Sequence, residues 1–399
     1  MSELENSGNN PLPLPPTLPV AARSDMQSYV RDSKYYYRDG SAVFLAEGQL
    51  FKFHVSLIAA DPEVEDYEFK HLIKDALDGF EGDMDKPGSN DSNPIVLPTD
   101  VRAAQFRKFL MIVYGGVADN EFQAFLHVLQ TPSDYSGIWA SRLIRLGYLA
   151  CRFGMKRLDA WVQVQIHTML RHFVRKHRVI DDWNARDILR LVRYMQTTTV
   201  IDYQHELLDF MRNIISTLIV QNYAFNDATP HNPIINVCAA LYQEREVLID
   251  SPGFFGFIFA IIVSLGHRSP IWIDRLTRED RRILYAANTI LICLSDHANL
   301  DVSWVIDPSV IKNVCTECSS MYDGCWKESF SRCKGLKSRV LLEDIRHIAA
   351  LPDYRFPFVS LLSRRITSCQ CLNNMSTQVE QRMESLYCAL TEKYKHLVE

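Results

Sequence analysis

Apolar residues near the start of the chain fall into two short runs. Two β-favouring runs, residues 42–46 and 50–53, flank a short glycine-containing segment at residues 47–49. Two such runs around a tight link predict a β-hairpin. Within the second run Phe51 and Phe53 share one face, so we expect that face to be buried.

After His54 the apolar spacing becomes helical, with Val55, Leu57 and Ile58 as the apolar positions. Residues 95–98 then predict a short strand that ends at a proline, with a helix behind it. A further short helix is expected between Gly116 and Pro132.

The strongest helical pattern follows this region. Apolar residues recur every three or four positions across residues 139–153, and again across 158–173. Two amphipathic helices joined by a short link predict an antiparallel pair.

Beyond residue 179 strand signals almost vanish. We expect helices near residues 185–195, 203–221, 234–247, 254–266, 278–294, 304–322, 339–350 and 376–398. The uncharged run 251–266 is too short and too rich in glycine and proline to cross a membrane, so we interpret it as a buried core helix.

The fold class predicted from these patterns is α+β, with a small sheet flanked by helical hairpins and a mainly α-helical C-terminal region. These patterns divide the chain into three segments. They are a Pro-rich tail expected to be disordered (1–28), an α+β domain with adjoining helices (29–178) and an α-helical region (179–399). A length of 399 residues suits two or three units.

Composition narrows the class of protein. The formal net charge of −5 is modest, so nucleic acid is not an expected partner. The N-terminal stretch has no basic segment followed by an apolar one, so we expect no signal peptide and no membrane anchor. Ten cysteines in such a chain are best read as reduced thiols of an intracellular protein, cytoplasmic or nuclear.

The order hairpin, Phe-x-His, helix, short strand and helix pair resembles the BTB/POZ domain, in the form common in basidiomycete fungi. Phe51, Phe53, His54, Leu57 and Ile58 match the opening motif of that family. The segment 93–98 is similar to its strand-then-helix unit, and 142–157 to its helix that ends in Ala-x-x-Phe-Gly. The family's usual Ser-x-x-Phe is replaced here by Asp-Pro-Glu-Val.

This resemblance implies a non-enzymatic protein-protein interaction module, such as an adaptor for a ubiquitin ligase or a transcriptional regulator. The partners it implies are a cullin-type ligase scaffold or another BTB chain. Phe122 and Phe125 are our candidates for interaction residues, since a short helix has little room to bury both. Packing of one or both into the domain core stays open as an alternative.

A metal- or ligand-binding regulatory protein is the alternative function. Its site would be a cysteine cluster made of Cys315, Cys318, Cys325 and Cys333. The first two have zinc-knuckle spacing, but the last two lack the usual second close pair. We therefore expect packing residues with no metal and no cofactor, and no residue can be assigned to catalysis.

Overall fold

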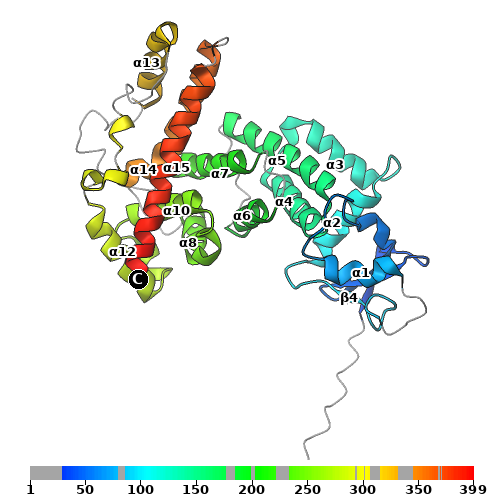
Figure 1. The fold of residues 1–399 in the computed structure, drawn as a ribbon. Helices are drawn as coiled ribbons and strands as arrows, with labels where there is room; N and C mark the ends of the chain where they lie inside the picture. Colours follow the sequence, from blue (N-terminus) through cyan, green and yellow to red (C-terminus); the bar gives the residue numbers. More distant parts are fainter. Residues whose placement is uncertain are drawn as a thin grey trace, which may run out of the picture.

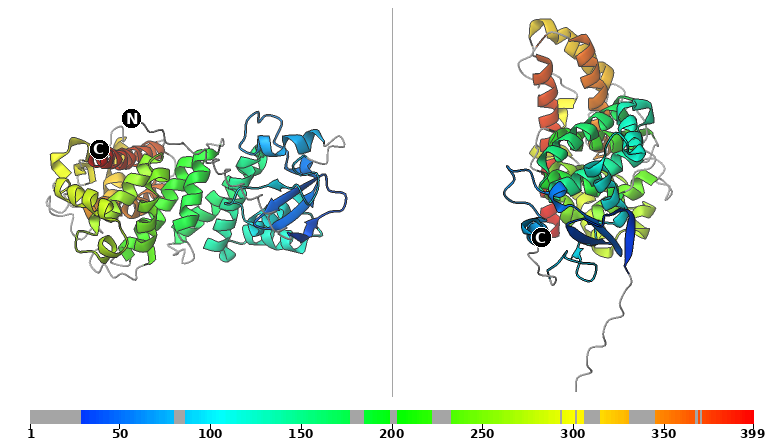
Figure 2. Two further views of the ribbon diagram at one scale, coloured as in Figure 1. Left: turned by 90° about the horizontal axis from the view of Figure 1, so that it is seen from below. Right: turned by 90° about the vertical axis from the view of Figure 1, so that its right-hand side faces the viewer.

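The computed structural model describes residues 29–79, 86–176, 185–198, 203–221, 233–292, 294–300, 302–305, 315–330, 345–366, 369 and 371–399. The predicted tail 1–28 and Cys333 lie outside this part of the chain. The described residues form a small sheet at one end of an elongated array of helices, which carries the C-terminal helices at its other end (Figure 1; Figure 2, left). The predicted α+β class is confirmed.

The sheet contains the predicted hairpin. Strands β2 (Ala42–Ala46) and β3 (Gln49–Phe53) pair antiparallel, and Ala46 lies opposite Gln49. Glu47 and Gly48 form the turn, and both have positive φ, of 46° and 81°. Positive φ at both positions is the property of a type I′ turn, whose twist matches that of the strands it joins.

Two further strands flank the hairpin, in the order β1-β3-β2-β4. The expected short strand is β4 (Ile95–Val96), parallel to β2. Strand β1 (Val30–Tyr36), parallel to β3, was not predicted from the sequence. Its sequence is mostly polar, and its buried Asp32 accepts a hydrogen bond from Arg107 at 2.7 Å.

The predicted register of the hairpin is confirmed by its packing. Phe51 and Phe53 are fully buried, and the Phe53 ring stacks on Phe44 with centroids 4.8 Å apart. Phe106 packs edge-on to Phe51 at 5.1 Å and lies against Phe53 at 5.8 Å. One helix therefore closes the apolar face of the sheet.

The helix expected after His54 is shorter than predicted. The chain makes only the 3-10 turn η1 (Val55–Ile58), and the next helix is α1 (Lys70–Asp78). Ile58 is buried, whereas the side chain of Leu57, predicted as an apolar position, is 43% exposed. A 3-10 turn of four residues has too few positions to bury all three apolar side chains.

Four longer helices complete the N-terminal part. They are α2 (Ala103–Tyr114), α3 (Asn120–Gln130), α4 (Gly137–Arg152) and α5 (Lys156–Lys176), with the turn η2 (Pro132–Asp134) between α3 and α4. The pair α4 and α5 packs together as predicted. Gly154, with φ of 71°, allows the tight reversal between them.

The C-terminal half is helical in the residues that the structure describes. Its helices are α6 (Ala185–Thr197), α7 (Gln204–Gln221), α8 (Pro233–Gln243), α9 (Arg245–Leu248), α10 (Pro252–Ser264), α11 (Pro270–Asp274), α12 (Arg278–Ile290), α13 (Thr316–Phe330), α14 (Ile345–Arg365) and α15 (Cys371–Val398). Short 3-10 turns occupy Leu294–Asp296, Ala298–Leu300 and Ser303–Val305. The helix expected at 304–322 instead begins at Thr316, and the one expected at 339–350 continues to Arg365.

Helix α10 is the centre of this half. Every residue from Gly253 to Val263 is buried, as expected for a core helix. It lies against α15 so closely that a Cβ atom on Gly256 would overlap the carbonyl oxygen of Tyr387. Thr391 of α15 donates a hydrogen bond to the carbonyl of Pro252 at 2.6 Å.

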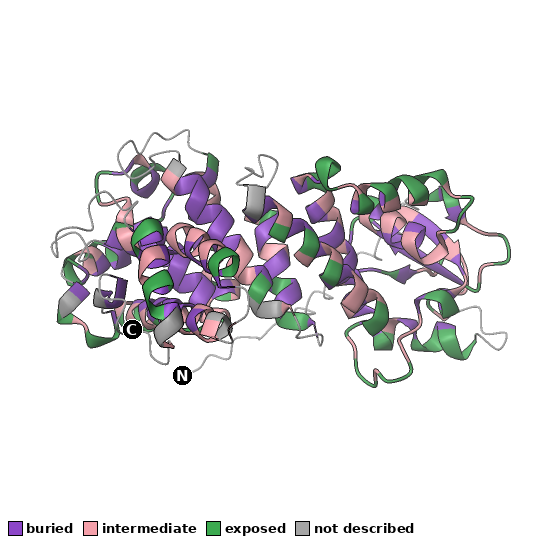
Figure 3. Ribbon diagram, turned by 90° about the horizontal axis from the view of Figure 1, so that it is seen from above, coloured by how far each residue is buried: buried purple, intermediate pink, exposed green. Residues whose placement is uncertain are grey.

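The two halves share one continuous core (Figure 3). Helix α6 packs on α4, and α7 packs on α5. The buried Tyr194 of α6 occupies the space left by Gly147 in α4, and its hydroxyl donates a hydrogen bond to Asp159 in α5. The boundary predicted at residue 178 lies outside the described residues, and the helices on its two sides pack together.

Among the helices of the described ranges, none combines the length and the apolar character needed to span a bilayer.

Replacing Phe53 by Asp should destabilise the N-terminal part by roughly 4 kcal/mol or more, because the carboxylate would be buried without a partner. Chemical denaturation followed by near-UV circular dichroism measures the loss. Lys52→Asp, on the opposite face of the same strand, is the matched control and should stay within about 1 kcal/mol of the wild type. Equal effects of the two substitutions would contradict the register.

Replacing Gly256 by Ala should destabilise the protein by about 2 kcal/mol, since the added methyl group forces α10 and α15 apart. The midpoint of urea unfolding is the measurement. Gly324→Ala in α13 is the control: its Cβ would meet nothing nearer than 3.6 Å. There the better helix propensity of alanine should raise stability by up to about 1 kcal/mol.

Candidate functional site

Four of the five motif residues help to hold the hairpin and the helices behind it together, and the fifth, Leu57, is exposed. Phe51, Phe53 and Ile58 belong to the core, as described above. His54 lies at the end of β3, where its backbone N–H donates a hydrogen bond to the hydroxyl of Tyr114 at 3.0 Å. Its ring Nε2 lies 3.5 Å from a carboxylate oxygen of Asp39. The hydrogen bond to Tyr114 ties the hairpin to the end of α2, which is a structural role.

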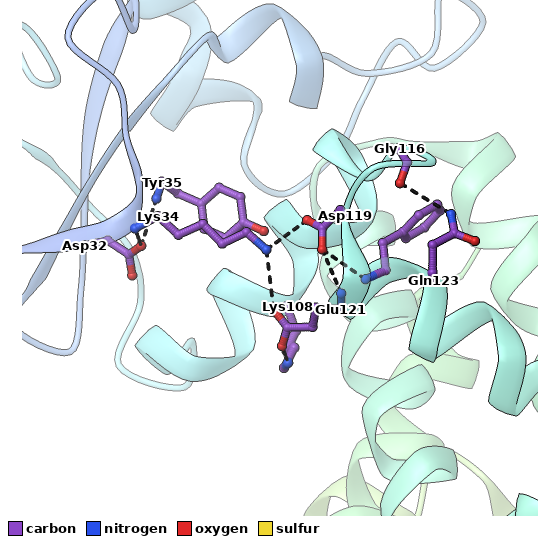
Figure 4. Close-up of polar contacts among 9 residues, drawn as sticks. Asp32, Lys34, Tyr35, Lys108, Gly116, Asp119, Glu121 and Gln123 are labelled. Carbon is purple, nitrogen blue, oxygen red and sulfur yellow. Dashed lines mark hydrogen bonds and ion pairs between the residues drawn. The ribbon is translucent and has the colours of Figure 1, made fainter.

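Helix α3 is attached to the sheet through its first turn (Figure 4). Asp119 precedes the helix, and its carboxylate accepts hydrogen bonds from the backbone N–H groups of Glu121 and Phe122. The ammonium group of Lys34 in β1 lies 2.8 Å from Asp119 and 3.5 Å from Glu121. Lys108 of α2 also pairs with Glu121. The start of α3 is therefore bound to both β1 and α2.

The two predicted interaction residues are three positions apart on α3, so they share one side of the helix, and both pack toward the core. Phe122 is half-buried and covers Gly115, where a Cβ atom would approach its ring to 2.5 Å. Phe125 is only 4% exposed and packs against Trp139 and Trp161, with ring centroids 5.7 Å and 6.4 Å away. Phe125 therefore packs into the core, which is the alternative left open above.

Phe125 forms one wall of a cavity between α2, α3 and α4. The cavity has a volume of about 140 Å³. Its apolar lining comes from Met111, Ile112, Ala124, Phe125, Trp139 and Leu146, and its charged lining from Lys108, Glu121 and Arg142. A small apolar hollow with a few charged groups at its edge has the composition of a docking pocket for one side chain.

Cations outnumber carboxylates at the edge of this cavity. The guanidinium group of Arg142 lies over the Trp139 ring, 4.2 Å from its centroid. Burial and the nearby cations, Arg142 first among them, lower the pKa of Lys108. Burial and the charge of Arg145 lower the pKa of Arg142. An acidic group of a partner would relieve this repulsion.

A larger cavity of about 310 Å³ lies between α2, α4 and α6. Arginine dominates its lining, with Arg102, Arg145, Arg186, Arg190 and Arg193. Asp187 accepts hydrogen bonds from two of these, Arg145 at 3.1 Å and Arg190 at 3.2 Å. Part of the positive charge is thus neutralised within the protein, and no sequence pattern had indicated this cavity.

The cysteines group differently from the sequence-based cluster. Cys325 lies in the core, where Arg365 donates a hydrogen bond to its sulfur at 3.8 Å. Cys315 and Cys318 lie instead beside Cys369 and Cys371. The structure therefore supplies the second close pair that the sequence interpretation lacked, as Cys-x-Cys rather than Cys-x-x-Cys. That short motif was the available signal for it.

Mutual hydrogen bonds separate the pKa values of these thiols. The bond with Cys318 is the largest cause that lowers the pKa of Cys315, to about 7. The same contact, together with burial, raises the pKa of Cys318 to about 12.

The sequence matches no protein-family model, and neither the curated proteins nor the solved structures include a significant match to it. The likeness to the BTB/POZ family therefore rests on the motif residues named above.

Replacing Asp119 by Ala should cost about 1–2 kcal/mol, because two backbone N–H groups at the start of α3 lose their acceptor. Asp119→Asn keeps an acceptor and loses only the exposed ion pair with Lys34, so it should cost a few tenths of a kcal/mol. Urea unfolding separates the two outcomes. Equal losses would show that the ion pair, rather than the cap, stabilises this helix.

The Asp119 contribution should also depend on pH. The hydrogen bond from Lys34, followed by that from the Phe122 backbone, lowers the pKa of this carboxyl group. A carboxyl group whose pKa is lower in the folded state than in the unfolded state stabilises the fold at pH values above the unfolded-state pKa. This stabilisation is lost as the pH falls through the lowered, folded-state pKa. The stability difference between wild type and Asp119→Ala should therefore shrink on acidification.

Proposed function

We propose that this chain is a non-enzymatic protein-protein interaction protein whose N-terminal part is a module of the BTB/POZ type. Two observations support the proposal: the motif residues resemble that family, and their hairpin is backed by a helix and followed by a helix pair. By the same resemblance we expect an adaptor of a ubiquitin ligase or a transcriptional regulator, acting in the cytoplasm or the nucleus.

A third observation, the cavity between α2, α3 and α4, carries the interaction part of this proposal. Its apolar floor is open to one side chain of a partner, and its edge carries Lys108 and Arg142 beside the single carboxylate of Glu121. Charge complementarity then selects the occupant: a helical segment of a partner protein that presents one apolar side chain flanked by carboxylates.

The chemistry of the lining fits recognition better than catalysis. None of the residues that line this cavity is a serine, cysteine or histidine. Its one carboxylate, Glu121, is paired with Lys108 and Lys34. Binding would use the apolar floor for affinity and the cations for orientation.

Ala124 offers a direct test because it lines the cavity from an exposed position on α3. Ala124→Arg in the full-length protein would fill the entrance and add a further cation. Surface plasmon resonance against a cullin-type scaffold, and sedimentation for self-association, measure the two expected kinds of binding. We expect at least a tenfold weaker interaction, the loss typical of a blocked central contact.

Gln130→Arg adds the same side chain to an exposed position of α3 that does not line the cavity, and should leave binding unchanged. Both variants should melt like the wild type. A folded wild-type protein that binds neither a cullin-type scaffold nor itself would count against the proposed partners. Equal binding by the two variants would exclude this cavity as the docking site.

A further inference from the structure

Four cysteine sulfurs meet where α13 and α15 begin. The Sγ atoms of Cys315, Cys318, Cys369 and Cys371 all lie within 4.8 Å of one another, and those of Cys315 and Cys369 are 3.9 Å apart. Zinc–sulfur bonds of about 2.3 Å in a tetrahedron place the sulfurs about 3.8 Å apart. A disulfide requires about 2.05 Å. The spacing fits four ligands around one ion.

We propose that these four thiols bind one Zn²⁺ ion in a structural, four-sulfur site. The proposal is independent of the interaction function above, since its residues belong to the C-terminal half and none of them lines the α2–α3–α4 cavity.

The local backbone supports this arrangement. The carbonyl of Cys315 accepts hydrogen bonds from the N–H groups of Cys318 and Ser319, at 3.1 Å and 3.0 Å, so the chain turns directly into α13. This turn brings the first two sulfurs to the same side. The N–H of Cys371 donates a hydrogen bond to the sulfur of Cys369 at 3.4 Å.

The electrostatic setting also favours bound thiolates. Cys318 lies in the first turn of α13, a helix of 15 residues, and Cys371 is the first residue of α15, a helix of 28 residues. The N-terminal end of a helix carries a partial positive charge. Four thiolates around Zn²⁺ have a net charge of −2, and both helix ends stabilise it.

Simple packing does not account for the cluster. Cys238 and Cys325 are packing cysteines of the core, and both are fully buried. Cys315, Cys369 and Cys371 are only partly buried, so an ion can reach them from solvent. A cysteine chosen for its apolar character has no reason to meet three others at a partly exposed position.

The ion would fix the first turn of α13, a helix that also packs on α14. Figure 2 (right) shows α13 beside the end of α14 and the start of α15, at the end of the molecule far from the C-terminus. The second half of α13 is held by aromatic packing, with Trp326 against Phe330 at 4.4 Å and against Phe358 at 5.0 Å. Zinc would hold its first turn. With four protein ligands, no position remains open for substrate, so the role is structural.

Metal content is the first measurement. Full-length protein purified under reducing conditions and supplied with Zn²⁺ should contain one zinc per chain by elemental analysis. The double variant Cys369→Ser/Cys371→Ser should lose it. Cys388→Ser is the matched control, because this partly buried cysteine lies on α15 outside the cluster, and it should keep one zinc. Zinc lost equally from both variants would overturn the assignment.

Cobalt spectroscopy of the wild type gives a test that does not depend on how the variants fold. Co²⁺ added to the metal-free protein should produce the visible bands of tetrahedral coordination and a sulfur-to-cobalt charge-transfer band, and Zn²⁺ should displace it. Hydrogen exchange should then quicken at residues 315–321 and 371–377 when zinc is removed, with β1–β4 unchanged. Wild-type protein that takes up neither ion while its thiols are reduced would overturn the proposal.

Discussion

The close contact between α10 and α15 is the constraint on which the C-terminal half depends. Helix α10 has no polar face, so it is stable only when surrounded on all sides. Gly256 lets α15 approach to backbone contact, and Thr391 adds a hydrogen bond to the start of α10. Helices α7, α8, α12 and α14 also pack on α10. One buried apolar helix thus holds the C-terminal half together, as Phe44, Phe51, Phe53 and Phe106 hold the sheet to α2.

The proposed interaction cavity is a result of how α3 is held. Lys34, Asp119 and Lys108 fix the first turn of α3, while Phe125 inserts its ring toward Trp139 and Trp161. Helix α3 is therefore held by ion pairs at its first turn and by aromatic packing further along, and a cavity remains between it, α2 and α4. Ion pairs at the surface contribute little stability by themselves, but here they set the position of an apolar wall.

The sequence predicted the hairpin and the helix pair because their apolar periods are strong. Phe51 and Phe53 flank the polar Lys52, and a strand places both on the same face. Strand β1 escaped prediction because its pairing with β3 stabilises a mostly polar segment. Helix α14 continues through Pro352 and Pro357, against local preference, because its neighbours bury it. Cys315 and Cys369 are 54 residues apart, and only the tertiary fold could bring them together.

The insertion of Tyr194 between α4 and α5 has a mechanical consequence. Its ring occupies the gap at Gly147 and its hydroxyl is bound to Asp159, so α6 cannot swing without emptying a buried pocket and leaving a polar group without a partner. Tyr194 therefore couples helices α4 and α5, next to the sheet, to the C-terminal half. A partner bound at the N-terminal end would therefore lie at a defined distance and angle from a ligand bound at the C-terminal end.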